Sequence, residues 1–329
     1  MANTTIYDVA GAAKVSLATV SRVMNNPEKV NPETREKVLQ VIKELGYRPN
    51  AIARGLASRK TTTVGIVMAD VTRASTSQFL GGIIDIAKRY DYAIKIFSMG
   101  ENEDIKEAMR AVVAEQVDGI LFLNDELDQN QMEMVMNHIQ DAQIPLVLCN
   151  VLYGADIPSV SIDYEKATYE VTKELLNQGR KNVYLVSTVR RYSVNDHKVK
   201  GYSMAMEEAG LTPMVFRTSG DVGINKLHFQ EFLKNHVVDG VIAVRDSIAV
   251  SFMNEAIKSG RSIPQDISVI GLQNTKYAIL SRPNLTCVDT PVYDIGAVSM
   301  RLLTKYMKHE EVNDSKVVLP YQIVKRESN

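Results

Sequence analysis

The chain has 329 residues, a formal net charge of −1 and 45% hydrophobic residues, as in an ordinary soluble protein with two or three domains. Its only cysteines, Cys149 and Cys287, exclude a disulfide framework and a zinc-binding spacing. It has no apolar signal segment, and no stretch approaches the ~18 apolar residues of a membrane span. We therefore expect a cytoplasmic protein with no membrane contact.

The charge is unevenly spread along the chain. Residues 1–60 carry ten basic and five acidic side chains, so this part is positive while the remainder is negative. Such an imbalance can arise by chance, or it can mark the surface that binds a polyanion.

Residues 5–25 read TIYDVAGAAKVSLATVSRVMN and contain two short amphipathic patterns joined by a tight turn. Ser16 is well placed to cap the second helix through its hydroxyl. Two such helices predict a helix-turn-helix, whose second helix enters the major groove of double-stranded DNA. The expected apolar faces are Ile6, Val9, Ala10 and Ala13 on the first helix, and Val20, Val23 and Met24 on the second.

A third helix is expected to begin at Pro32 and to end at Gly46, with Val38, Val41, Ile42 and Leu45 as its core stripe. Residues 49–62 are only weakly helical, and two interpretations remain open. The segment is either a flexible linker, or it folds only on DNA and inserts Leu56 into the minor groove as an apolar wedge.

From Thr63 onward, short apolar runs alternate with amphipathic stretches, which predicts parallel sheets covered by helices on both faces. The series fits two halves with a boundary near Asp163 and a ligand cleft between them. Neither GxGxxG nor GxxxxGK[ST] occurs, so no nucleotide-phosphate site is indicated. The expected strands are 64–70, 93–99, 119–124, 145–151, 159–163, 182–188, 214–220, 240–244, 268–272 and 285–289, and the expected helices are 78–90, 103–116, 130–143, 169–179, 199–210, 226–235, 249–260 and 293–307.

The stretches Ile6–Ala10, Ala18–Val23 and Tyr47–Asn50, with the two-lobed α/β pattern, resemble the LacI/GalR family of bacterial repressors over the full length. The resemblance implies an all-α helix-turn-helix DNA-binding domain with a hinge helix, followed by a two-lobed, periplasmic-binding-protein-like α/β core with parallel sheets. It also implies a homodimer on a pseudo-palindromic operator. The expected domains are a head at 1–48, a hinge at 49–62, a first subdomain at 63–162 plus 290–320, and a second at 163–289 plus 321–329.

The resemblance also assigns DNA contacts. Arg22 is expected to pair with a guanine, and Leu17 and Ala18 to meet thymine methyl groups. For Tyr7 the alternative is a packing role in the head, and for Arg22 it is a solvated position without function. The remaining expected DNA contacts are Thr5, Tyr7, Ser16, Thr19, Ser21, Asn25, Tyr47, Asn50, Ala53, Arg54, Leu56 and Ala57.

Within the family, the stretches at 53–65, 116–119 and 293–307 are similar to a subgroup that controls carbon catabolite genes. That subgroup uses a protein corepressor, the phosphocarrier HPr phosphorylated on serine. The helix at 293–307 suits this role, because its spacing puts Asp294, Arg301, Lys305 and Lys308 on an exposed face. The alternative is an ordinary solvated helix face. The expected corepressor surface is Lys88, Arg89, Tyr90, Tyr293, Asp294, Val298, Arg301 and Lys305.

The alternative regulator is a small-molecule effector, such as a sugar or sugar phosphate, in the inter-lobe cleft. Lys198 and Gln273 stand where sugar-binding members usually have an Arg and an acidic residue, which weakens that interpretation. The segment Asp70–Phe79 also lacks the subgroup's usual aromatic pair, which suggests a divergent paralogue. The expected cleft residues are Asp70, Asn150, Asp163, Lys198, Arg245, Asp246 and Gln273. For residues 245–247 the alternative is a simple loop.

An enzymatic function is the least favoured interpretation. The five histidines are scattered, and no nucleophile–base pair, metal cluster or phosphate loop is apparent. We expect no cofactor and no metal.

Overall fold

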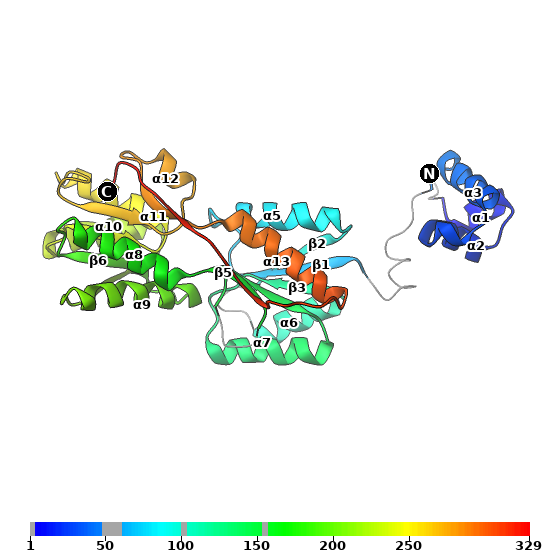
Figure 1. The fold of residues 1–329 in the computed structure, drawn as a ribbon, viewed down its shortest axis with the longest axis horizontal. Helices are drawn as coiled ribbons and strands as arrows, with labels where there is room; N and C mark the ends of the chain where they lie inside the picture. The colour runs from blue at the N-terminus through cyan, green and yellow to red at the C-terminus, as the bar shows by residue number, and fades with distance from the viewer. Residues whose placement is uncertain (1–3, 48–60, 100–103, 153–156) are drawn as a thin grey trace. The chain divides into compact units, whose positions relative to one another are not determined.

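The computed structural model describes residues 4–47, 61–99, 104–152 and 157–329. Contacts divide the chain into two compact units, Met1–Thr61 and Thr62–Asn329, which are named here the head and the core (Figure 1). Among the described residues, no helix has both the length and the apolar character that a membrane crossing requires.

The head consists of α1 (Ile6–Ala13), α2 (Leu17–Asn25) and α3 (Pro32–Glu44), with the short 3₁₀ helix η1 (Pro27–Lys29) before α3. Both helices of the predicted helix-turn-helix begin at a side-chain N-cap. Thr5 and Asp8 form a capping box on α1, and the Ser16 hydroxyl accepts from the Thr19 amide at 3.1 Å on α2. The buried head core is Val9, Ala10, Ala13, Val20, Val23 and Val38.

The end of α3 corrects one prediction. Leu45 was expected in the core stripe, but it is the C-cap of α3 and its side chain is 39% exposed. Gly46 follows in the left-handed conformation, with φ +58°, and reverses the chain. The Tyr47 amide then donates to the Ile42 carbonyl, and Tyr47 packs against the head core in place of Leu45.

The first lobe of the core is a six-stranded parallel sheet with helices on both faces (Figure 1). Its strand order is β11-β5-β4-β3-β1-β2. The bounds are β1 (Thr63–Met68), β2 (Ala93–Ser98), β3 (Gly119–Phe122), β4 (Leu146–Cys149), β5 (Ser159–Ile162) and β11 (Lys316–Leu319), with α5 (Thr76–Arg89), α6 (Ile105–Ala114) and α7 (Gln129–Ala142).

The second lobe repeats this strand order as β12-β10-β9-β8-β6-β7, except that β12 runs antiparallel to β10. α8 and α9 cover one face of its sheet, and α10 and α11 cover the other (Figure 1). The bounds are β6 (Val183–Thr188), β7 (Met214–Thr218), β8 (Gly240–Ala243), β9 (Ser268–Gly271), β10 (Thr286–Asp289) and β12 (Gln322–Val324), with α8 (Tyr164–Asn177), α9 (Ser193–Glu208), α10 (Val222–Asn235), α11 (Asp246–Lys258) and α12 (Lys276–Leu280).

The predicted fold class is confirmed, and each of the ten predicted strands is present. The sequence did not predict β11, β12 or α12, because these short elements are largely unburied and lack the continuous apolar run of the predicted strands. The helices α8 to α11 begin three to six residues earlier than predicted. Their first turns carry polar side chains, several of them buried, and this hides the apolar periodicity.

The last long helix, α13 (Val292–Met307), returns the chain from the second sheet to the first lobe. It packs along α5 and against β3 and β4 (Figure 1). Two glycines permit this packing, because the helix backbones touch where they cross. A Cβ on Gly82 would lie 2.0 Å from the Tyr293 carbonyl oxygen, and one on Gly296 would lie 2.4 Å from the Phe79 carbonyl oxygen.

We predict that Gly82→Ala destabilises the core by about 1–3 kcal/mol, because the new methyl group can fit only if the two helix backbones separate. The midpoint of urea-induced unfolding, followed by circular dichroism, measures this change.

The neighbouring Gly81→Ala is the matched control. A Cβ there would lie 3.6 Å from the Tyr293 ring, which is an ordinary contact. That variant should gain roughly 0.5–1 kcal/mol from the better helix propensity of alanine. Equal unfolding midpoints for the two variants would show that the crossing is not tightly packed.

Candidate functional site

The exposed face of α2 carries the three residues that were predicted to read base edges. Leu17, Ala18 and Arg22 are all exposed, whereas Val20 and Val23 on the opposite face of the helix are buried. α2 therefore presents two apolar side chains at its capped N-terminus and one guanidinium, from Arg22, in its last turn to solvent.

The residues predicted to contact phosphate are less uniform in exposure. Tyr7 is 70% exposed, which contradicts the alternative packing role. The Thr5 hydroxyl donates to the Asp8 carboxylate at 2.7 Å, and the hydrogen bonds from Thr5 lower the pKa of Asp8. Thr19, Ser21 and Tyr47 are half-buried, and Ser16 is exposed. The remaining predicted DNA contacts lie outside the described residues; they are the Asn25 side chain, Asn50, Ala53, Arg54, Leu56 and Ala57.

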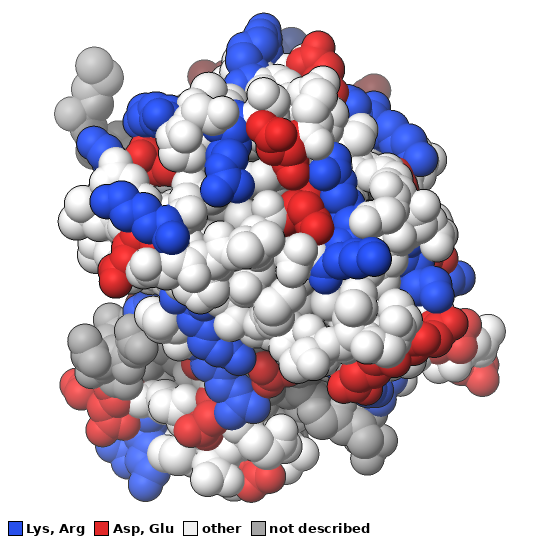
Figure 2. Space-filling view, turned by 90° about the vertical axis from the view of Figure 1, so that its left-hand side faces the viewer, with Lys and Arg blue, Asp and Glu red and all other residues white. Residues whose placement is uncertain are grey.

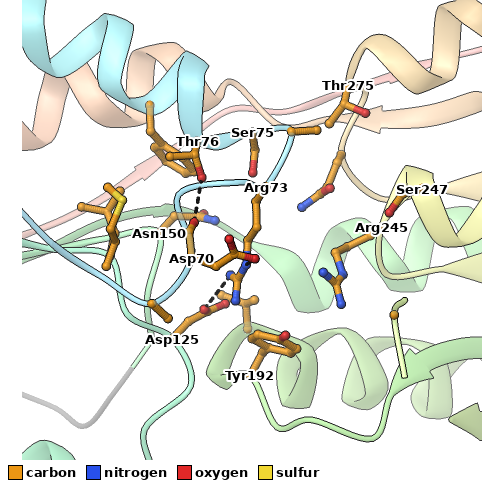
Figure 3. Close-up of a pocket in the computed structure, with 18 of the residues that line it drawn as sticks. Asp70, Arg73, Ser75, Thr76, Asp125, Asn150, Tyr192, Arg245, Ser247 and Thr275 are labelled. Carbon is orange, nitrogen blue, oxygen red and sulfur yellow. Dashed lines mark hydrogen bonds and ion pairs between the residues drawn. The ribbon is translucent and has the colours of Figure 1, made fainter. Parts of the chain in front are cut away.

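A cavity of about 260 Å³ lies between the two lobes of the core (Figure 3). The carboxyl ends of strands from both sheets form its walls, as expected for open parallel sheets. Five of the seven predicted cleft residues line it, namely Asp70, Asn150, Lys198, Arg245 and Gln273.

Asp163 and Asp246 do not line the cavity. Asp163 caps α8 by accepting from the Lys166 amide at 2.9 Å. Asp246 is fully buried and accepts from the Thr275 hydroxyl at 2.9 Å. Burial raises the pKa of Asp246, an effect that its hydrogen bonds from Thr275 oppose. Both carboxyl groups therefore make hydrogen bonds within the second lobe instead of facing the cavity.

The sequence did not predict the central charged group of the cavity. Arg73 forms ion pairs with Asp125 at 3.0 Å and with Glu126 at 2.5 Å. Burial lowers the pKa of Arg73, but the charges of Asp125, Tyr192 and Glu126 outweigh this effect and raise it overall. Asp125 and Glu126 directly follow the predicted strand at 119–124, and Arg73 lies three residues after the one at 64–70; these positions were the available signal.

Lys198 is a second basic group at the cavity wall, and Arg245 is a third. Its Nζ donates to the Val244 carbonyl at 3.1 Å and lies 4.9 Å from the centre of the Tyr164 ring. Burial lowers its pKa to about 8, against the opposing charge of Asp125. Lys198 therefore loses its proton in a pH range where an exposed lysine stays charged.

A second candidate surface lies on the first lobe, across the outer faces of α5 and α13. This α5–α13 face is defined by Lys88, Arg89, Tyr90, Tyr293, Asp294, Val298, Arg301 and Lys305. All are exposed except Val298, which is half-buried, so the predicted orientation of α13 is confirmed. On the end of the core formed by the second lobe, basic and acidic side chains are interspersed (Figure 2).

Side-chain contacts fix the two tyrosines of this face. The Tyr293 hydroxyl donates to Asp85 on α5 at 2.6 Å, and this hydrogen bond raises the pKa of Tyr293. The Lys308 Nζ lies 4.6 Å from the centre of the Tyr90 ring.

Comparison with known proteins identifies the family. Residues 5–50 match the model "Bacterial regulatory proteins, lacI family", and residues 172–329 match "Periplasmic binding protein-like domain". The chain is also 40% identical, over 337 aligned residues, to catabolite control protein A of Priestia megaterium, with 99% of both chains covered. The chain belongs to the LacI family. It is a DNA-binding transcriptional regulator similar to catabolite control protein A.

Other members agree with this assignment. A regulator named pepR1 from Lactobacillus delbrueckii is 37% identical over 98% of this chain and 97% of its own. The crystal structure of CcpA from Lactococcus lactis has a TM-score of 0.71 at 29% identity, covering 81% of this chain and 98% of that one. The lac repressor dimer bound to operator matches the fold, with a TM-score of 0.89 at 23% identity and 99% of both chains covered.

The described residues contain no group of three or more His, Cys, Asp or Glu side chains arranged to hold a metal ion. The features that remain for function are the α2 surface, the inter-lobe cavity and the α5–α13 face.

We predict that Lys198→Met removes a rise in core stability between about pH 8 and pH 10.5. In that range unfolding takes up a proton, because Lys198 is neutral when buried but charged in the unfolded chain. Raising the pH therefore stabilises the wild-type fold relative to the variant, by roughly 3 kcal/mol over the whole range. Urea unfolding at a series of pH values measures the difference.

Lys200→Met on the same helix is the control, because its side chain is 65% exposed and pairs with Glu165 at the surface. That variant should keep the wild-type pH profile. If Lys198→Met also keeps it, the lysine is charged in its buried position.

Proposed function

We propose that the protein is a cytoplasmic repressor of carbon catabolite genes. In this proposal it binds pseudo-palindromic operators as a homodimer, and serine-phosphorylated HPr docks on the α5–α13 face as its corepressor. The near full-length similarity to catabolite control protein A supports the regulatory role.

The charge of the α5–α13 face is the observation that carries the proposal. Arg301 and Lys305 on α13 are exposed, as are Lys88 and Arg89 on α5. A phosphoserine brings about two negative charges and three acceptor oxygens, which an exposed guanidinium can pair with in a bidentate manner. Val298 adds a half-buried apolar spot of the kind that anchors a protein partner.

The packing beneath the face also favours a docking role. Because the α5 and α13 backbones touch at Gly82 and Gly296, the two rows of side chains cannot slide independently. The Tyr293–Asp85 hydrogen bond and the Lys308–Tyr90 contact fix both aromatic rings across the two helices. A surface ordered before binding loses less conformational entropy when a partner docks.

For the head, we propose that Arg22 pairs with a guanine and that Leu17 and Ala18 contact thymine methyl groups. Their shared exposure on α2 supports these roles. We propose that the phosphate contacts, which set the position of α2 in the groove, are made by Thr5, Tyr7, Thr19 and Ser21. Thr5 would contact phosphate while its hydroxyl also bonds to Asp8 in the cap of α1.

Exposed apolar side chains on the second lobe support the homodimer. Val222 and Leu227 on α10 are 66% and 64% exposed, and Ile279 and Leu280 on α12 are 59% and 71% exposed. Val222 on α10 and Tyr277 on α12 both line the inter-lobe cavity. Large exposed apolar side chains of this kind are typical of a surface that a second subunit covers.

A small-molecule effector in the inter-lobe cavity is the second candidate. The solved CelR–cellobiose complex has a TM-score of 0.73 to this chain at 25% identity. The observation in its favour is Arg245, a half-exposed guanidinium that points into the cavity beside Ser247 (Figure 3).

We predict that Arg22→Ala weakens binding to the preferred operator by roughly 1–3 kcal/mol and reduces the preference between operator variants, because a bidentate base contact is lost. Fluorescence anisotropy with operator and scrambled duplexes measures both effects. Lys43→Ala, a neutralisation in the last turn of α3, is the control and should change operator and scrambled affinity alike. A uniform loss for Arg22→Ala as well would mean that Arg22 contacts only phosphate.

We predict that serine-phosphorylated HPr raises operator affinity and that Arg301→Glu lowers this enhancement by at least about tenfold, since the phosphate would face a like charge. Anisotropy titrations with phosphorylated and unphosphorylated HPr measure it. Arg110→Glu, the same change at an exposed site on α6, should retain the enhancement. If HPr has no effect on the wild-type protein, the corepressor proposal is wrong and the small-molecule effector is favoured.

A further inference from the structure

One carboxylate in the cavity wall connects the two lobes of the core. The Glu126 side chain, 4% exposed, lies after β3 in the first lobe and pairs with Arg73 of the same lobe at 2.5 Å. Arg190, after β6 in the second lobe, reaches the same Glu126 oxygen at 3.3 Å. Because the carboxylate is buried, this ion pair is screened by solvent less than a surface pair.

Aromatic and backbone contacts reinforce the same junction. The Tyr192 ring, from the second lobe, lies between Arg73 and Arg245, with guanidinium carbons 4.7 Å and 5.3 Å from its centre (Figure 3). The Ser193 amide, at the start of α9, donates to the Asp125 carbonyl of the first lobe at 2.8 Å. The Ser193 hydroxyl in turn accepts from the Leu152 amide at 3.2 Å.

The size of the cavity is consistent with a cleft that the chain itself fills. Its volume of about 260 Å³ lies below the roughly 300–1,000 Å³ of typical small-molecule sites. The Arg73 side chain extends into this space toward Asp125 and Tyr192 (Figure 3). Its guanidinium occupies hydrogen-bonding groups that a bound ligand would otherwise use.

We propose that Arg73, Glu126 and Arg190 form an internal bridge that holds the two lobes together without a ligand in the cleft. Arg73 orients Glu126 from within the first lobe, and Arg190 supplies the contact from the second lobe. In this arrangement an effector entering the cleft must displace Arg73 from its carboxylates, so ligand binding would loosen the junction rather than create it. This inference goes beyond the proposed function, since it concerns the protein without HPr and without DNA.

The test is hydrogen–deuterium exchange of the full-length protein in the absence of DNA, HPr and sugar. Arg190→Ala should speed exchange at the amides of Ser193 and Leu152 by about fivefold. This factor corresponds to the upper end of the stabilisation that a partly exposed ion pair provides. Glu126→Gln keeps the shape of the side chain and removes its charge, and it should produce the same change.

Arg191→Ala is the matched control. Arg191 is adjacent in sequence, but it pairs with Asp196 of its own lobe at 3.1 Å, and both side chains are more than half exposed. That variant should leave exchange at Ser193 and Leu152 unchanged. If these amides exchange in Arg190→Ala and Glu126→Gln at the same rate as in Arg191→Ala, the bridge does not hold the lobes together and the proposal is overturned. This outcome would leave the HPr proposal untouched.

Discussion

The contact between the α5 and α13 backbones is the constraint on which the rest of the core depends. Gly82 and Gly296 let two helices that are more than 200 residues apart in sequence touch main chain to main chain. This packing returns the chain from the second sheet to the first lobe, so that each lobe is built from separate stretches of sequence. The same contact fixes the outer faces of both helices as one surface. Binding of a partner protein at that surface can therefore shift the strands of the first lobe, which lie directly beneath it.

The inter-lobe cavity follows from the same topology. Both sheets end their parallel strands at the cleft, and the polar residues that follow those strands meet there. In this chain they meet as an ion network centred on Arg73 and Glu126. The lobes therefore have a direct contact of their own beside the cavity. Such a junction suits a regulator whose signal reaches it through a protein on its outer surface.

Much of the fold was predictable, because buried strands and capped helices have local sequence signals. Val9, Val20 and Val38 follow from helical periodicity, and the cap at Ser16 follows from its position before an apolar run. The exposed face of α13 followed from spacing alone. Leu45 was misassigned because Gly46 reverses the chain one residue later, so the Schellman turn packs the half-buried Tyr47 against the head core instead. The Arg73–Glu126–Arg190 network could not be predicted, since its members are 53 to 117 positions apart and meet only in the folded core.

Asp163 and Asp246 were wrongly predicted to line the cleft. Polar residues that follow strands can make hydrogen bonds within a lobe without lining a cavity.

The central claim is that the α5–α13 face couples a phosphorylated protein to the DNA-binding head. It is tested most directly by measuring, with isothermal titration calorimetry, the affinity of serine-phosphorylated HPr for the protein alone and for the protein on its operator. Linkage requires each ligand to raise the affinity of the other by the same factor. The account predicts that operator DNA tightens HPr binding by roughly 5- to 150-fold, equal to the enhancement of operator binding by HPr. Identical HPr affinity with and without operator would contradict it.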